Sequence, residues 1–273
     1  MSLDKRQYSE RLVDRVRESW ARHPNRLILI LVFVTGIAVS EAFLFSGRRW
    51  MAIWGHFATL VVCLSFLQRG VDATHVQVIL LVPLFRLVNL GMPVFFELTV
   101  YWFPMIYGPL IPGLVLVDRL NPDLDVPFGW REGLILLPLT IPLGWVLAEV
   151  ESEILQSAAL IPAWNVVEVA TITVVMVCFV GFVEEYLFRG LLQPTLQESL
   201  GRWPGVLLAS ALFGLMHSGY GVPAEVLFAG VIGLVFGLIY DYLDSLVFVT
   251  VVHGVLNVFL FAVLPIHGSL FPV

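Results

Sequence analysis

Residues 163–190 read AWNVVEVATITVVMVCFVGFVEEYLFRG. The first part of this stretch is apolar enough for lipid, whereas the second part carries Glu184, Glu185 and Arg189 among apolar neighbours. Each charged side chain inside hydrocarbon costs at least ~2.5–3.5 kcal/mol on insertion scales. The stretch therefore predicts a membrane helix whose charged residues either pair with one another or serve a function.

The composition of the whole chain agrees with a membrane location. Its 273 residues are 59% hydrophobic and 13% charged, and the mean hydropathy is +0.90. Soluble domains carry about 25% charged residues. We therefore expect an all-α, polytopic protein whose first partner is the lipid bilayer. The net charge of −6 argues against a nucleic-acid partner.

A helix needs roughly 20 apolar residues to cross a bilayer. Spans are expected near residues 28–46, 52–68, 76–95, 99–117, 133–149, 165–193, 204–218, 224–243 and 246–264. Several are short, so the count is eight or nine. Repeated prolines between residues 76 and 117 also allow one re-entrant element there.

The distribution of basic residues predicts the orientation of the chain. With the N-terminus inside, almost all basic residues fall on inner segments, and the outer loops keep only Arg48 and Arg49. Basic residues favour the cytoplasmic side of a membrane. We expect a multi-pass protein of the cell (cytoplasmic) membrane with a cytoplasmic N-terminus.

Three regions are expected along the chain. Residues 1–26 form a charged, amphipathic cytoplasmic segment, residues 27–160 form N-terminal transmembrane helices, and residues 161–266 carry the polar motifs described next. In the second region, Arg86 and Asn89 share a helical face. For Arg86 we favour a structural pairing with an acidic residue such as Glu97 over a contact with a substrate carboxylate.

The adjacent glutamates have different expected environments. Residues four apart share a helical face, so Glu185 and Arg189 should pair. Glu184 points about 100° away from Glu185 and has no partner on its own helix. A desolvated carboxylate of this kind suits a general base or acid. A buried ion-pair cluster that joins helices is the alternative.

Two later apolar segments supply further polar side chains. SALFGLMHSGYG, residues 210–221, places Phe213 and His217 four apart, and VVHGVLNVFLF, residues 251–261, does the same for His253 and Asn257. If successive helices alternate in direction, both histidines, Asn257 and Glu184 lie near mid-membrane, as judged from the helical rise. We expect these four side chains to meet.

Two chemistries fit this set. In the first, Glu184 and His217 activate a water, and His253 and Asn257 donate hydrogen bonds to the oxyanion of a cleaved amide. In the second, Glu184, His217 and His253 are zinc ligands. Because Asn is a poor zinc ligand and a good oxyanion donor, the first is favoured. Neither an H-E-x-x-H zinc motif nor a G-x-S-x-G elbow is present.

Three motifs in order give the chain a family resemblance. E-E-x-x-x-R at 184–189, F-x-x-x-H at 213–217 and H-x-x-x-N at 253–257 resemble those of the CPBP family of CAAX proteases and bacteriocin-processing enzymes, often labelled Abi. This family includes the Ras-converting CAAX endopeptidases. The resemblance covers about residues 165–264, and the preceding 160 residues contain no matching motif.

The resemblance implies an all-helical intramembrane glutamic protease. It implies that Glu184 is the catalytic base, that His217 helps to activate water, and that His253 and Asn257 form the oxyanion hole. Glu185 and Arg189 support this site, as does Phe213 of the second motif. No cofactor is then needed, and the substrate is a peptide or a membrane-associated protein.

Other functions also fit a polar cluster within a membrane. One alternative is a zinc-dependent intramembrane protease that uses the same residues. A second is a non-catalytic immunity or scaffold protein, and a third is a transporter with a proton relay. Replacement of Glu184 by Gln separates a protease from the second and third alternatives, because only a protease then leaves its substrate uncut. The zinc protease is tested by its zinc content and by loss of activity on chelation.

Overall fold

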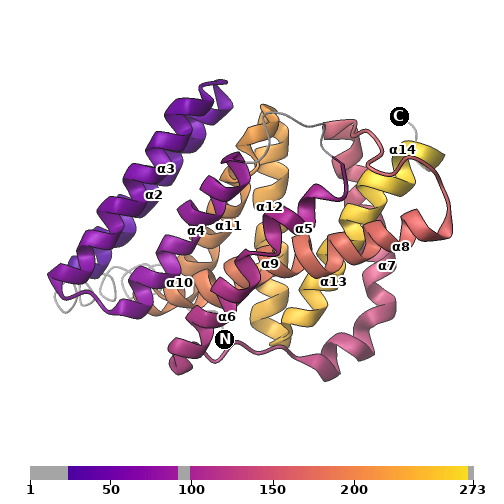
Figure 1. Cartoon of the computed structure of the whole chain (residues 1–273). Coiled ribbons are helices and arrows are strands. Elements are labelled where there is room, and N and C mark those ends of the chain that lie inside the picture. Colours follow the sequence, from indigo (N-terminus) through magenta and orange to yellow (C-terminus); the bar gives the residue numbers. More distant parts are fainter. Residues whose placement is uncertain (1–23, 92–98, 270–273) are drawn as a thin grey trace, which may run out of the picture.

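The computed structural model describes residues 24–91 and 99–269. Within these ranges the chain folds into helices and connecting loops, without a β-strand (Figure 1). The prediction of an all-α protein is confirmed. Nearly all of the expected amphipathic segment, residues 1–26, lies outside the described ranges, and so does Glu97.

The elements follow one another in this order: α2 (Pro24–Phe45), α3 (Arg49–Leu64), η1 (Ser65–Arg69), α4 (Ala73–Gly91), α5 (Trp102–Tyr107), α6 (Leu110–Leu120), η2 (Pro122–Leu124), α7 (Trp130–Leu155), α8 (Val166–Val175), η3 (Met176–Gly181), α9 (Phe182–Glu185), η4 (Tyr186–Leu192), α10 (Gln193–Leu200), α11 (Arg202–Leu215), η5 (Ser218–Tyr220), α12 (Pro223–Leu243), α13 (Leu246–Val258), η6 (Phe259–Val263) and α14 (Leu264–His267).

Eight helices in the described ranges are long and apolar enough to cross a membrane. The multi-pass prediction is therefore confirmed, with one correction. The expected span at 204–218 is helix α11, which has 14 residues and is not among the eight. At a rise of 1.5 Å per residue, a helix of this length covers only about two thirds of a 30 Å hydrocarbon layer.

The helix that carries the glutamate pair is the longest element. It runs continuously from Val166 to Leu200 through α8, η3, α9, η4 and α10. Asn165 begins it as an N-cap, because its side chain accepts hydrogen bonds from two backbone N–H groups of the first turn. Figure 1 shows this helix crossing the middle of the molecule, between the α2–α3 pair and the end that contains α7 and α14.

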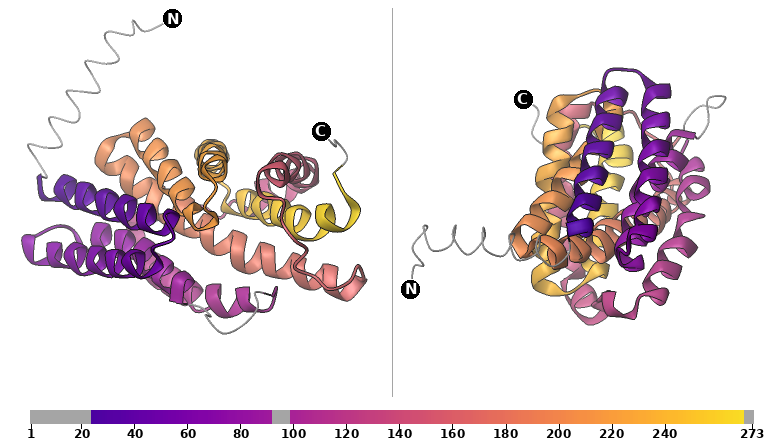
Figure 2. Two further views of the ribbon diagram at one scale, coloured as in Figure 1. Left: turned by 90° about the horizontal axis from the view of Figure 1, so that it is seen from above. Right: turned by 90° about the vertical axis from the view of Figure 1, so that its left-hand side faces the viewer.

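The proline-rich region contains two candidate spans, close to the expected spans at 76–95 and 99–117. Helix α4 continues through Pro83 as far as Gly91. After residues 92–98, the chain forms two short helices, α5 and α6, which together make one candidate span, Trp102–Leu120. Figure 2, in which these helices can be followed from two further directions, shows them beside the glutamate helix.

Glycines bring the backbones of the functional helices close together, because they have no side chain to keep the backbones apart. A Cβ atom on Gly181 would lie 2.8 Å from the carbonyl oxygen of Thr250 and 3.1 Å from the nitrogen of Gly254. On α11, a Cβ on Gly214 would lie 2.6 Å from the carbonyl oxygen of Val226 on α12. These close approaches place the motif-bearing helices within side-chain reach of each other.

Candidate active site

The two glutamates sit on one turn of α-helix between two π-helical segments. Helix α9 contains Glu184 and Glu185, with η3 before it and η4 after it. π-Helical turns are rare and occur frequently at functional sites. The Glu185 side chain is completely buried, whereas Glu184 keeps some exposure. The two neighbours therefore occupy different environments, as the helical-face argument predicted.

Glu185 is held by Arg189 one turn later. The Nη1 of Arg189 lies 2.8 Å from Oε1 of Glu185, which confirms the predicted pair. Its Nη2 donates to the carbonyl oxygen of Gly233 on α12, at 3.1 Å. The guanidinium also lies over the ring of Phe213, 4.3 Å from its centroid. These contacts join α9, α11 and α12 around one buried charge pair.

His253 completes this cluster from α13. Its Nδ1 lies 2.7 Å from Oε1 of Glu185, the same oxygen that contacts Arg189. An ionised carboxylate only accepts hydrogen bonds, so Nδ1 carries the proton of this contact. The Nε2 atom points to the other glutamate and lies 3.9 Å from Oε2 of Glu184. Glu185 thus orients the imidazole, a contact that the sequence motifs alone did not predict.

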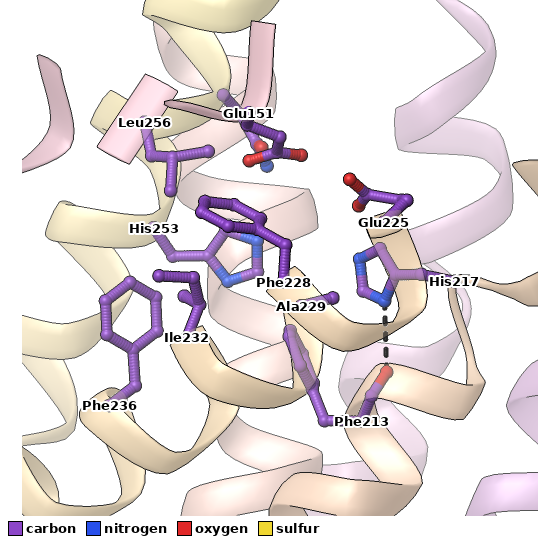
Figure 3. Close-up of a pocket in the computed structure, with 11 residues that line it drawn as sticks. Glu151, Phe213, His217, Glu225, Phe228, Ala229, Ile232, Phe236, His253 and Leu256 are labelled. Atoms are coloured by element: carbon purple, nitrogen blue, oxygen red, sulfur yellow. Dashed lines mark hydrogen bonds between the residues drawn. The ribbon is translucent and has the colours of Figure 1, made fainter. Parts of the chain in front are cut away.

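The tautomer of His217 follows from a backbone contact. Its Nδ1 lies 3.0 Å from the carbonyl oxygen of Phe213 (Figure 3). A carbonyl oxygen accepts and cannot donate, so Nδ1 is the protonated nitrogen. In the neutral ring, Nε2 then has a free lone pair. Phe213 therefore supports His217 through its backbone and Arg189 through its ring.

Tyr107 is a partner of Glu184 that the sequence reasoning missed. The hydroxyl group of Tyr107 donates to Oε1 of Glu184 at 2.7 Å. Tyr107 ends α5, in the proline-rich region where no motif is apparent. The only signal in the sequence was a phenol in an otherwise apolar segment, WFPMIY. Glu184 lacks a partner on its own helix but has one from the N-terminal half of the chain.

Two cavities meet at Phe213 and His217, which line both of them. The larger, of about 440 Å³, is also lined by Glu184 and Tyr107. The smaller, of about 30 Å³, is lined by both histidines and by Asn257. The four predicted site residues are therefore brought together: Glu184 lines the larger cavity, His253 and Asn257 line the smaller, and His217 lines both.

Many of the residues that line the large cavity belong to the N-terminal half of the chain. They are Leu44, Arg49, Phe85, Arg86, Asn89, Leu90, Phe103, Ile106 and Tyr107. Its volume lies within the 300–1,000 Å³ typical of ligand sites. Apolar side chains surround Glu184, while the two arginines and Asn89 add polar groups to the wall. This cavity combines an apolar wall with a carboxylate.

A second buried network anchors the loop after His217. Arg86 donates to Glu41 on α2 through Nε at 2.7 Å and Nη2 at 2.8 Å. The structural pairing expected for Arg86 is therefore present, with Glu41 as the acidic partner. The Ser218 hydroxyl group also donates to Glu41. In addition, Nε2 of His56 lies 3.1 Å from Oε1 of Glu41. Helix α2 thereby holds the residue next to His217.

The C-terminal part of this architecture matches a known family. Residues 166–259 match the family model described as type II CAAX prenyl endopeptidase Rce1-like. This part of the chain is similar to the CAAX-protease family. The resemblance to the CPBP family is thus confirmed, and the matched region contains all three motifs. No curated protein and no solved structure matches the chain.

The matched family is one of proteases, which are hydrolases. The eight candidate spans indicate a multi-pass membrane protein. The matched region begins at α8, so α2–α7 lie outside it. Tyr107, Glu41, Arg86 and His56 therefore come from a part of this chain that the CAAX-protease match does not include, whereas Ser218 lies within the match.

The zinc alternative places Glu184, His217 and His253 around one metal ion. In the described part of the chain, no group of three or more His, Cys, Asp or Glu side chains is arranged to hold a metal ion. Zinc binds carboxylate oxygen and imidazole nitrogen at about 2.0–2.2 Å. His253 Nε2 and Glu184 Oε2 lie 3.9 Å apart, and Nδ1 of His253 is engaged by Glu185. Two ligands of one tetrahedral zinc ion lie about 3.4 Å apart, and zinc-bound histidines commonly donate their other N–H to a carboxylate, so these two contacts are compatible with the zinc alternative.

Proposed function

We propose that the protein is an intramembrane endopeptidase that hydrolyses a peptide bond with a water activated by Glu184 and His217. The observation that carries this proposal is the convergence of Glu184, His217, His253 and Asn257 on two adjoining cavities within the family-matched region. We place the protein in the cell membrane with a cytoplasmic N-terminus, on the basis of the basic residues described above.

The first step needs a base and a second polar group for the attacking water. Glu184 faces the large cavity, where its carboxylate takes the proton from water as the oxygen attacks the carbonyl carbon. His217 presents Nε2 as an acceptor that orients the same water, because its Nδ1 proton is used by Phe213. Glu184 then returns the proton to the leaving amine as the C–N bond breaks.

The second requirement is stabilisation of the negative charge on the carbonyl oxygen. Asn257 supplies an amide N–H₂ group and lies one helical turn beyond His253, on the same pocket wall. For His253 to donate through Nε2, the ring must carry protons on both nitrogens, since Nδ1–H already faces Glu185. Glu184 and Glu185 together balance the positive charges of this form and of Arg189. His253 and Asn257 are then the two oxyanion donors.

The substrate class follows from the cavity and its location. A cavity of about 440 Å³ with mostly apolar walls, inside a bundle of membrane helices, accepts an apolar peptide segment or the end of a membrane-associated protein. Part of the cavity wall comes from the N-terminal half of the chain, outside the family-matched region. We propose that this wall selects the substrate.

To test this proposal, the natural gene is replaced with one that encodes the Glu184→Gln protein. Mass spectrometry of protein termini then compares the membrane proteomes of the variant and wild-type strains. A protein that is cut in the wild-type strain should accumulate uncut in the variant strain. Glu132→Gln, at an exposed position on α7, is the matched control. If every product persists in Glu184→Gln cells that contain folded protein, the proposal is wrong and a binding, immunity or transport function is favoured.

The role of metal needs a separate measurement. Under the water-activation mechanism, protein purified with a chelator retains full turnover, and zinc does not increase it. If the purified protein contains stoichiometric zinc, and its activity is lost on chelation and restored by zinc, the zinc alternative with Glu184, His217 and His253 as ligands replaces the proposal.

A further inference from the structure

Two carboxylates from other helices reach the smaller cavity beside the proposed catalytic residues. Glu151 comes from the last turns of α7 and Glu225 from the first turn of α12. Both line the cavity of about 30 Å³ with His217, His253 and Asn257. Figure 3 shows the two carboxylates at one end of this cavity, on the same side of the two imidazole rings. Neither acid belongs to the three motifs.

Among the described residues, Glu225 lacks the partner that a buried carboxylate normally has. Its side chain is fully buried, and within residues 24–91 and 99–269 neither of its oxygens has a hydrogen-bond partner. Glu151 is 8% exposed and lies close enough to line the same small space. Neither an arginine nor a lysine is among the residues that line this cavity. Buried carboxylates are normally paired or hydrogen-bonded, because their desolvation is costly.

We propose that Glu151 and Glu225 form a subsite for a primary ammonium group of the substrate. An ammonium group carries three N–H donors and a positive charge, which matches two acceptor carboxylates. A water-sized group needs about 10–15 Å³ of such a cavity. The cavity of about 30 Å³ therefore admits an ammonium group and one water.

The size of the cavity and the number of its ligand groups favour an ammonium group over a guanidinium group or a metal ion. A guanidinium group is planar and carries three nitrogens, so it is larger than the space available. A metal ion usually requires more ligands, and the described residues contain no group of three or more metal-binding side chains arranged to hold one. The ammonium group, a compact point charge, is the cation that this cavity accommodates.

The subsite lies beside the proposed catalytic residues, and this position predicts a role in substrate specificity. It adjoins His253 and Asn257, and it shares Phe213 and His217 with the large cavity. A substrate whose apolar part fills the large cavity would place a nearby amine between Glu151 and Glu225. This inference rests on the proposed function, since it assigns a specificity site to the same protease. The amine is either a lysine side chain or a free amino terminus.

A binding experiment tests the subsite without relying on catalysis. The full-length protein, purified in lipid nanodiscs, is titrated with three lysine amides while its unfolding temperature is measured. Nα-acetyl-lysinamide offers only the side-chain amine, Nε-acetyl-lysinamide only the α-amine, and the diacetyl compound neither. Sodium chloride and calcium chloride at matched ionic strength are further controls.

We expect at least one amine probe to raise the unfolding temperature saturably, and the more effective probe identifies the source of the amine. Glu225→Gln keeps the shape and removes the charge, so it should weaken this binding by about 10- to 100-fold, as expected for a charge-assisted hydrogen bond. Glu132→Gln should bind like the wild type. If Glu225→Gln does not fold, Glu151→Gln is the second variant, with the same expected loss.

Three results would overturn the subsite: equal binding of the neutral diacetyl probe, unchanged amine binding in the folded Glu151→Gln or Glu225→Gln protein, or an equal saturable effect of sodium or calcium. Failure of the proposed function is recognised separately. The Glu184→Gln protein should still bind the amine probe while losing proteolysis. If it keeps proteolysis and binds the probe, the subsite stands and the proposed role of Glu184 does not.

Discussion

The Nδ1 of His253 lies 2.7 Å from Oε1 of Glu185, an oxygen that also accepts from Arg189 at 2.8 Å. One buried carboxylate thus holds a histidine from α13 and an arginine from its own helix. Its neighbour Glu184 faces the large cavity and accepts a hydrogen bond from Tyr107. The two adjacent glutamates are therefore expected to respond differently to the same substitution.

Glu184→Gln should abolish turnover and leave stability near that of the wild type, because glutamine still accepts the Tyr107 hydrogen bond. Glu185→Gln should instead leave Arg189 unpaired in a buried site, at a cost of about 3–5 kcal/mol in the free energy of unfolding. Denaturant titration and single-turnover rates of both variants check this. Retained activity in folded Glu184→Gln protein would refute the assignment.

Asn257→Ala should reduce the turnover number by about 10²–10³ and leave substrate affinity near that of the wild type, as expected for loss of one oxyanion donor. Under the zinc alternative, Asn257 supports the ligands, and its loss should weaken metal affinity by about 10–100-fold. Rate, substrate Kd and bound metal are measured on one preparation. An unchanged rate is incompatible with the oxyanion role.

Tyr107→Phe should lower activity without changing the fold, because it removes only the hydroxyl group that donates to Glu184. A hydrogen bond to a charged group contributes about 1.5–3 kcal/mol, which corresponds to a 10- to 100-fold loss of kcat/KM if the contact orients the base. Tyr101→Phe, at an exposed position in the same region, is the matched control. Equal activity of the two variants would show that Tyr107 does not orient Glu184.

Ser218→Ala should lower turnover because Ser218 ties the loop after His217 to Glu41. A displacement of about 1 Å at a catalytic group costs up to about 10²-fold in rate. Ser218→Thr keeps the hydroxyl group and should restore activity, whereas Ser46→Ala, at an exposed position on the α2–α3 turn, should have no effect. Full activity of Ser218→Ala would show that the loop does not need this anchor.

Gly181→Ala should destabilise the protein by about 1–3 kcal/mol, because its Cβ would press against the backbone of α13. The same shift would move His253 away from Glu184 and reduce activity. Gly113→Ala on α6 is the control, since a Cβ there has no neighbour within 4 Å. Unfolding midpoints of the two variants in denaturant provide the measurement. A stable, active Gly181→Ala protein would contradict the close approach.

The local features of this protein were predictable because they depend on residues close together in the chain. Apolar runs of about 20 residues predict membrane helices whatever their neighbours are. The Glu185–Arg189 pair follows from helical spacing alone, since residues four apart share a face. Helical geometry also predicts that the adjacent side chains of Glu184 and Glu185 point about 100° apart. Span limits were less predictable, and helix α11 is shorter than its apolar run suggested.

Contacts between helices were decided only by the tertiary structure. Tyr107 reaches Glu184 across 77 positions of the sequence, and Ser218 reaches Glu41 across 177. No periodicity links such residues, because their approach depends on how whole helices cross and where glycines let them come close. The cavity shared by Glu151 and Glu225 has the same origin, since packing of α7 and α12 around α13 brings two unrelated acids together.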